Sequence, residues 1–156
     1  MTIPYAYPLP RIDDLTDEVG KSQYISEIDS LKGYYQISLT ERAQEVSAFI
    51  TPFGLYEYNA MPSGMRNAPH TFQRAMDYLL QDIVGVSAYL DILIFTEHWE
   101  QHLARLREVL TRLQSAQLTA KLAKTIFGEA TVTYLGHEVG NGRVRPKEAN
   151  ISAILD

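Results

Sequence analysis

Two aspartates stand at the ends of apolar runs, where a carboxylate is either solvated in a turn or held for chemistry. Asp91 interrupts the stretch VSAYLDILIF, and Asp29 follows the run YISEI. Local sequence lets Asp29 cap the turn that follows it, because aspartate side chains bind nearby backbone amides. It likewise lets Asp91 end a strand at a hairpin. Both the structural and the chemical interpretation stay open at this level.

Two histidines form the other pattern that bears on chemistry. His98 and His102 are four residues apart, a spacing that places two side chains on one helix face, where they can bind a metal ion. Glu100 and Gln101 do not complete the HExxH pattern of zinc proteases, which argues against a metal role. The chain has no cysteine, which excludes disulfides, a thiol nucleophile and cysteine-bound zinc.

Strand patterns position the two aspartates. Alternating apolar residues predict strands at 24–28 and 34–39, and two more strands around a turn at Pro52 and Gly54. Asn141-Gly142 between alternating residues predicts a two-residue hairpin near the end of the chain. Asp29 and Asp91 therefore both fall at strand ends.

Helical patterns separate these strands. A short helix is predicted near 13–19. A longer helix is predicted from Ala68, with Asn67 as N-cap and Pro69 in its first turn, and a third follows Trp99. Strands interrupted by helices predict an α+β fold, an antiparallel sheet with helices packed on one face plus a C-terminal β-hairpin.

Composition narrows the class of protein. The chain has 156 residues, enough for one domain. Its net charge of -5 argues against a broad basic face for nucleic acid, although basic residues gather between 121 and 147. No basic start followed by a long apolar run is present, and no apolar stretch approaches about 18 residues. We therefore expect no membrane association and an intracellular protein, cytoplasmic or nuclear.

Five segments in order carry a resemblance to a known family. They are SEIDSLKGYYQISL, TPFGLYEYNAMPSGMRNAPHTFQRAM, AYLDILIF, EHWEQHLARLREVLTRLQSAQL and YLGHEVGNGRVRP. With PYAYPLPRIDDL before them, the chain resembles reverse transcriptases of gypsy-type long-terminal-repeat retrotransposons over nearly its whole length. The resemblance implies a polymerase palm in one domain, residues 1–156: partial fingers at 1–23, fingers and palm at 24–134, and primer-grip hairpin and start of the thumb connection at 135–156.

The resemblance implies RNA-directed DNA polymerase chemistry, in which two divalent ions about 3.5 to 4 Å apart promote nucleotide addition to a primer. It implies that Asp29 and Asp91 are catalytic metal ligands for Mg²⁺ or Mn²⁺, joined by the backbone carbonyl of Ser30. The implied partners are an RNA or DNA template with its primer and deoxynucleoside triphosphates. The remaining polyprotein regions, including thumb, ribonuclease H and integrase, are expected to lie outside this fragment.

One departure from the family pattern affects the site. The family motif is Tyr-x-Asp-Asp at a hairpin tip, whereas this chain has Tyr89-Leu90-Asp91-Ile92. A single-residue deletion explains this because ILIF continues as the family's next strand does. The loss weakens metal binding, and a one-residue slip turns ILIF to the wrong face unless the turn is rebuilt. We expect an impaired active site.

The resemblance assigns further residues to two groups. The nucleotide-binding group includes Tyr34, whose ring would exclude a 2'-hydroxyl. Ser63 departs from the bulky or amide side chain usual at its position. The group consists of Tyr34, Ser63, Gly64 and Lys124, and the primer/template group of Tyr89, Asn67, Gln73, Leu135, Gly136 and His137. Without the resemblance, Tyr34 is read as sheet packing, Asn67 as a helix cap, and Lys124 and His137 as surface residues.

Two other functions compete with the polymerase. A decayed or domesticated remnant would act at most as a nucleic-acid or protein-binding module. An unrelated α+β domain ranks last, because it requires five ordered matches by accident. Whether the chain is a polymerase or a remnant, a palm without its covering fingers and thumb is expected to expose an apolar patch.

Overall fold

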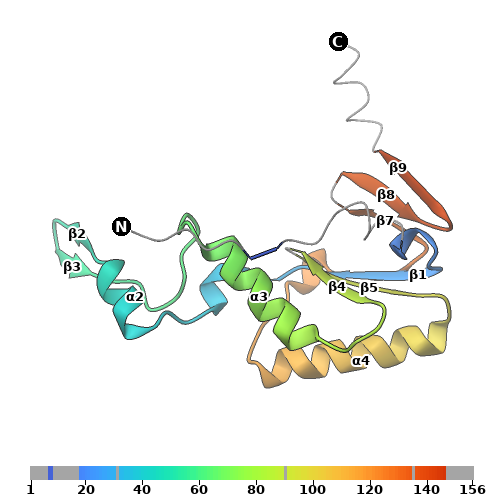
Figure 1. Ribbon diagram of the computed structural model, residues 1–156, viewed down its shortest axis with the longest axis horizontal. Coiled ribbons are helices and arrows are strands. Elements are labelled where there is room, and N and C mark those ends of the chain that lie inside the picture. Colours follow the sequence, from blue (N-terminus) through green and yellow to red (C-terminus); the bar gives the residue numbers. More distant parts are fainter. Residues whose placement is uncertain (1–6, 9–17, 31, 90, 135, 147–156) are drawn as a thin grey trace, which may run out of the picture.

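A four-stranded antiparallel sheet forms the centre of the computed structural model, which describes residues 7–8, 18–30, 32–89, 91–134 and 136–146 (Figure 1). The strand order is β4-β5-β1-β6. Strands β1 and β5 pair over five consecutive residues, from Tyr24 opposite Thr96 to Ile28 opposite Ile92. The bounds are β1 Tyr24–Ile28, β4 Val86–Tyr89, β5 Asp91–Thr96 and β6 Ile126–Glu129.

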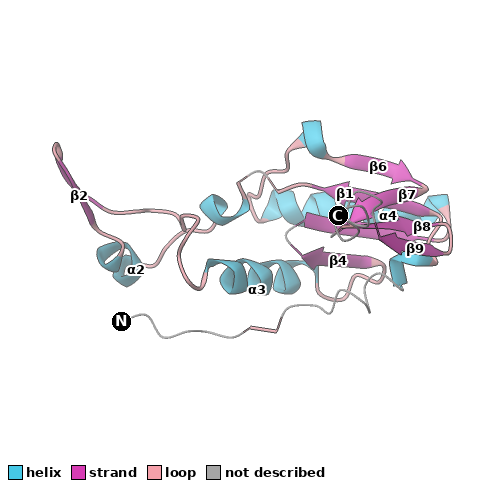
Figure 2. Ribbon diagram, turned by 90° about the horizontal axis from the view of Figure 1, so that it is seen from above, coloured by secondary structure: helices cyan, strands magenta, loops and turns pink. Residues whose placement is uncertain are grey.

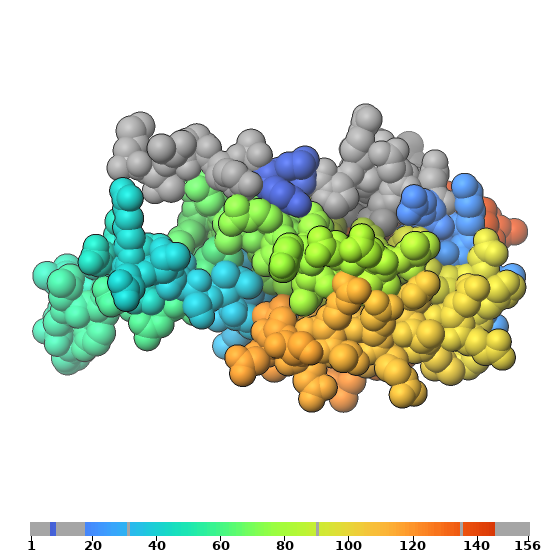
Figure 3. Space-filling view, turned by 60° about the horizontal axis from the view of Figure 1, so that its bottom comes forward, coloured from blue at the N-terminus to red at the C-terminus, as the bar shows by residue number. Residues whose placement is uncertain are grey.

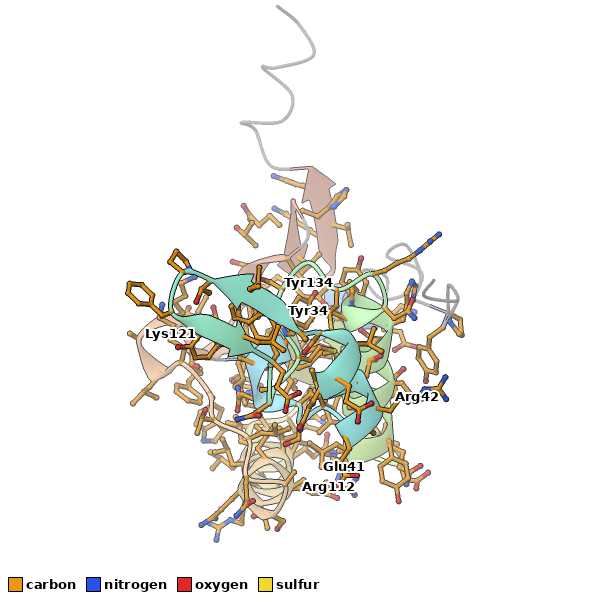
Figure 4. The ribbon with its side chains drawn as sticks, turned by 90° about the vertical axis from the view of Figure 1, so that its left-hand side faces the viewer. Tyr34, Glu41, Arg42, Arg112, Lys121 and Tyr134 are labelled. Carbon is orange, nitrogen blue, oxygen red and sulfur yellow. The ribbon has the colours of Figure 1, made fainter. Side chains whose placement is uncertain are left out.

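Two helices cover one face of this sheet, α3 (Ala68–Leu80) and α4 (Trp99–Ser115) (Figure 1). Arg112 of α4 fastens them together, donating from Nη1 to the carbonyls of Leu79 at 3.0 Å and Gln81 at 2.7 Å, where α3 ends (Figure 4). Both predicted helices are confirmed. Among the described residues, no helix is long and apolar enough to cross a membrane.

A three-stranded sheet covers the other face (Figure 2). It consists of β7 (Thr131–Tyr134), β8 (His137–Gly140) and β9 (Arg143–Pro146). Gly140 opposes Arg143, and Asn141 and Gly142 have φ of 51° and 72°, the positive values that a type I′ turn needs at both central residues. The predicted hairpin is confirmed.

Strand β5 sends side chains to both faces of the central sheet, because successive side chains of a strand point to opposite faces. Both sets are buried. Ile92 and Ile94 belong to the core under α3 and α4. Leu93 and Phe95 belong to the core under β7 and β8. The apolar run ILIF therefore joins the two cores, and both faces of the central sheet are covered.

Residues 40–59 form an arm that projects from the palm-like body (Figures 1 and 3). This body, called the palm below, consists of the central sheet with α3, α4 and β7–β9. It consists of α2 (Glu41–Val46) and the two-stranded sheet of β2 (Phe49–Thr51) and β3 (Gly54–Tyr56). The strands predicted around Pro52 and Gly54 are therefore present. The stem of the arm is held by the N–H of Leu39 donating to Asn59 O at 2.9 Å and that of Met61 donating to Ile37 O at 2.8 Å.

Two local predictions differ from the structure, and a third falls mostly outside the described residues. The strand predicted at 34–39 is instead a 3-10 helix, η1 (Gly33–Gln36), followed by a bridge between Ser38 and Ala60. The reason is tertiary packing, since the ring of Tyr34 sits edge-on to that of Phe72 with centroids 5.6 Å apart, which overrides the β propensity of tyrosine.

The other two predictions concern the ends of helices. Asn67 precedes α3 as predicted, but its side chain makes no capping hydrogen bond. The short helix predicted near 13–19 falls mostly outside the described residues, which show helix at 18–20.

Candidate active site

Asp29 and Asp91 meet across the two central strands. Ile28 opposes Ile92 in the β1–β5 ladder, so the same register carried one residue further places Asp29 opposite Asp91. Directly opposed residues have Cβ atoms about 4.5 to 5.5 Å apart. Because Ile28 and Ile92 face the helices, the alternation of a strand turns both aspartates toward the β7–β9 side.

The surroundings of Asp91 determine its charge. Burial raises the pKa of Asp91, and the nearby negative charge of Asp29 raises it further. The positive charge of Lys124 and a hydrogen bond from the backbone N–H of Ser30 act in the opposite direction. Lys124 Nζ lies 3.5 Å from Asp29 Oδ2. One ammonium group therefore interacts electrostatically with the carboxylates of both Asp29 and Asp91.

Glu27 is a third acidic residue here, which the sequence interpretation missed. Burial raises its pKa first, followed by the charges of Asp91 and Asp29. The signal was present in the sequence, since Glu27 and Asp29 are two apart in a strand and so share a face. In the described part of the chain, however, no three His, Cys, Asp or Glu side chains are arranged to hold a metal ion.

Ser30 directs its backbone toward Asp91. Its bridge to Ala120 is flanked by a hydrogen bond from Lys121 N to Asp29 O of 2.8 Å, the pattern of a non-hydrogen-bonded antiparallel pair. In such a pair the N–H and C=O of Ser30 point away from Ala120, and its N–H reaches Asp91. Two carboxylates and this carbonyl are hard oxygen donors, the kind that Mg²⁺ prefers.

The hairpin that carries Asp91 is short. Tyr89 opposes Asp91, so only Leu90, which lies outside the described residues, separates the paired positions. The ladder continues without a bulge to Val86 opposite Ile94. This turn keeps both faces of ILIF in their cores, so the register error expected from a deletion without a rebuilt turn is not observed.

Two of the four residues assigned to the nucleotide line one cavity of about 290 Å³. Its wall includes Tyr34 and Ser63, and also Ser30, which binds Asp91. Tyr35 Oη lies 3.4 Å from Ser63 Oγ across it. Gly64 follows with φ of 99° and open space where a Cβ would stand. The cavity is lined by Ser30, Lys32, Gly33, Tyr34, Tyr35, Ser63 and Phe72.

The primer/template residues are more scattered. Gln73 is buried, and its amide donates to Ala88 O and to Asp77 Oδ1 at 2.9 Å, so it binds β4 to α3. Asn67 lines a separate cavity at the base of the arm. Gly136 and His137 lie at the start of β8, with His137 opposite Tyr134. Leu135 falls outside the described residues.

Tyr134, labelled in Figure 4, links β7 to the hairpin that carries Asp91. Its hydroxyl donates to the carbonyl of Tyr89 at 3.2 Å, and its side chain is 2% exposed. Burial raises its pKa, as do the charges of Asp91 and Glu27. Tyr89 packs against the same apolar cluster.

The histidine pair is divided between core and surface. His102 is fully buried, with Nε2 2.7 Å from Ser26 Oγ and Nδ1 3.0 Å from Thr96 Oγ1, while His98 is exposed ahead of α4. Burial lowers the pKa of His102. Both ring nitrogens of His102 bind the sheet, so the pair does not form a metal clamp.

Comparison with known proteins covers almost the entire chain. Residues 1–139 match the family model described as reverse transcriptase (RNA-dependent DNA polymerase). The Pol polyproteins of the Drosophila melanogaster transposons 297 and gypsy are 39% and 34% identical, each match covering 99% of this chain and 15% of the relative. A foamy viral protease-reverse transcriptase solved with an RNA/DNA hybrid superposes with a TM-score of 0.78, at 26% identity over 90% of this chain and 20% of that one.

Proposed function

The chain belongs to the reverse transcriptase family, and on that premise we propose that it forms the palm of an RNA-directed DNA polymerase whose metal ligands are Asp29 and Asp91. The observation that carries the proposal is the pairing of Ile28 with Ile92, each next to one of the aspartates, together with the effect of the Asp29 charge on the pKa of Asp91. The chain spans about 15% of its transposon relatives, so the reaction of the whole polyprotein is proposed here.

The reaction is nucleotide addition to a primer. Reverse transcriptases use divalent metal ions, and Mg²⁺ or Mn²⁺ in this site would activate the primer 3'-hydroxyl and offset the charge of the triphosphate. Asp29, Asp91 and the Ser30 carbonyl would hold the metal. The N–H of Ser30 fixes the carboxylate of Asp91, which keeps that ligand oriented.

The cavity beside Ser30 would receive the nucleotide. Tyr34, held edge-on by Phe72, is placed to exclude a sugar with a 2'-hydroxyl. Ser63 and Gly64 would allow the close approach of a base or phosphate. Lys124, already 3.5 Å from Asp29, would interact with the phosphates and protonate the leaving pyrophosphate.

A template with its primer would lie over the face between the aspartates and β7–β9. The RNA/DNA hybrid in the foamy viral structure supports this class of partner. Tyr89, Gly136 and His137 would contact the primer, with Asn67 toward the template. Gln73, which is buried and donates to Ala88 O, would act indirectly by holding β4 against α3. Thumb, ribonuclease H and integrase regions would be supplied by the remainder of the polyprotein.

The shortened hairpin limits this activity. With one aspartate at the tip, less negative charge offsets the repulsion between two dications. A binding module without catalysis is therefore the second candidate, favoured by the observation that the described residues contain no three-ligand metal cluster.

Primer extension on an RNA template separates the two functions. With Mg²⁺ or Mn²⁺, extension that falls at least about 100-fold in Asp29→Ala, the loss typical of a core catalytic group, supports the polymerase. A matched control is Glu45→Ala in the arm. Absence of extension, together with primer-template binding that weakens as salt rises, supports the module. Insertion of an aspartate after Asp91 is expected to raise extension, and no gain would exclude the deletion as the limiting defect.

A further inference from the structure

Strand β4, one half of the β4–β5 hairpin, has sheet support on one side only. It is at the edge of the sheet, whereas β5, which carries Asp91, lies between β4 and β1. Asp91 and Tyr89 face each other at the end of the β4–β5 ladder. Fraying of this last pair would therefore loosen Asp91 on its β4 side.

Tyr134 reaches this tip from the neighbouring sheet. It is the last residue of β7, and its ring lies in the apolar cluster that includes Leu93 and Val139. Only the hydroxyl is polar, and it donates to the Tyr89 carbonyl at 3.2 Å. The packing of the ring and the hydrogen bond of the hydroxyl together fix the position of this side chain.

We propose that Tyr134 is a positioning residue that holds the shortened hairpin, and with it Asp91, in register with Asp29. The positioning role deepens the proposed function. Only its effect on catalysis rests on that function. Because Tyr134 and His137 oppose each other across the β7–β8 turn, displacement of that turn by a primer end would be transmitted to the carboxylates.

Nearby charges favour the neutral phenol that this role needs. Burial, Asp91 and Glu27 all raise the pKa of Tyr134. The hydroxyl therefore keeps its proton and donates it to the carbonyl at neutral pH. A phenylalanine at this position would keep the ring packing and lose only the donor.

Amide hydrogen exchange of Tyr134→Phe tests the positioning role without requiring activity. We expect the amides of Asp91 and Ile92 to exchange roughly five-fold faster, the factor expected for loss of one hydrogen bond. Amides of Ile25 and Ile28 in β1 should be unchanged. The matched control, Tyr78→Phe, removes a hydroxyl from a tyrosine that is 76% exposed and should change neither set.

A second readout separates positioning from general stability. The Kd for Mn²⁺ alone, followed by electron paramagnetic resonance, is expected to rise several-fold in Tyr134→Phe, while the unfolding equilibrium in urea shifts by no more than the roughly five-fold that one hydrogen bond accounts for. Unchanged exchange at the hairpin would overturn the positioning role, as would uniform acceleration throughout the sheet. Faster hairpin exchange in a protein that binds no Mn²⁺ would support the tether and count against the proposed polymerase.

Discussion

The palm and the arm are built from similar residues but bury them very differently. In the palm, Ile25, Leu93 and Ile94 are 0% exposed. In the arm, Phe53 is 89%, Ile50 83% and Leu55 72% exposed. The apolar patch is expected on a palm without its covering, whereas these exposed apolar side chains lie on the arm, which projects from the rest of the molecule (Figure 3).

This difference separates two sources of order. The palm sheet is closed by helices on one face and strands on the other, so its register is fixed by burial on both sides. A two-stranded hairpin such as β2–β3 is marginal by itself. The carboxylates lie on the palm, at the ends of the paired strands β1 and β5.

The largest expected contrast is in stability. Ile94→Ala should lower the free energy of unfolding by about 2 to 5 kcal/mol, because it leaves a cavity in the core. Ile50→Ala on the arm should change it by less than about 0.5 kcal/mol. Urea unfolding measures both. Equal losses would remove the distinction between palm and arm.

A pH effect follows from His102, in the palm. Burial lowers its folded-state pKa, so below about pH 6.5 the unfolded chain binds more protons. The contribution of His102 to stability is therefore fully present above that pH. It is lost as the pH falls through the lowered pKa of His102 in the folded protein. His102→Gln, which cannot titrate, should show a smaller loss between pH 7 and pH 5 in urea titrations.

Exposed His98 supplies the control for that experiment. His98→Gln should keep the pH dependence of the wild type, because that ring is solvated in both states. Comparison with the wild type also cancels Asp91 and Glu27, whose raised pKa values act oppositely and destabilise the fold as the pH rises. Identical curves for the two variants would contradict the assignment to His102.

A smaller effect is expected within the site. Asp29→Asn removes the negative charge that raises the pKa of Asp91, so the pKa of Asp91 should fall toward its ordinary value. Carboxyl ¹³C NMR titration measures it. Glu45→Gln, on the arm, serves as the control and should leave Asp91 unchanged. A pKa that stays the same in Asp29→Asn would show that burial alone accounts for the shift.

The smallest effect is expected at the tip of the arm. Phe53→Ser replaces an apolar side chain that is 89% exposed, so unfolding should change by less than about 0.5 kcal/mol. Self-association, measured by sedimentation velocity, should decrease because an exposed apolar patch is reduced. A large loss of stability would show that the arm has a core of its own.

The sequence by itself determined the strand around Ser26, the helix from Ala68 and the turn at Asn141-Gly142. Periodicity and turn chemistry are local, so these features can be predicted from neighbouring residues. The ordered motifs supplied the family. They also predict that Asp29 and Asp91 share one site and that an aspartate is deleted after Asp91, and both stay predictions.

Only the tertiary structure decided which side chains meet across elements. Gln73 and His102 turn inward to bind the sheet, and Tyr34 leaves the predicted strand to pack on Phe72. The hydroxyl of Tyr134 finds the carbonyl of Tyr89 from another sheet. Contacts of this kind depend on distances between segments remote in the chain, which the packing of helices and sheets sets and a one-dimensional pattern does not contain.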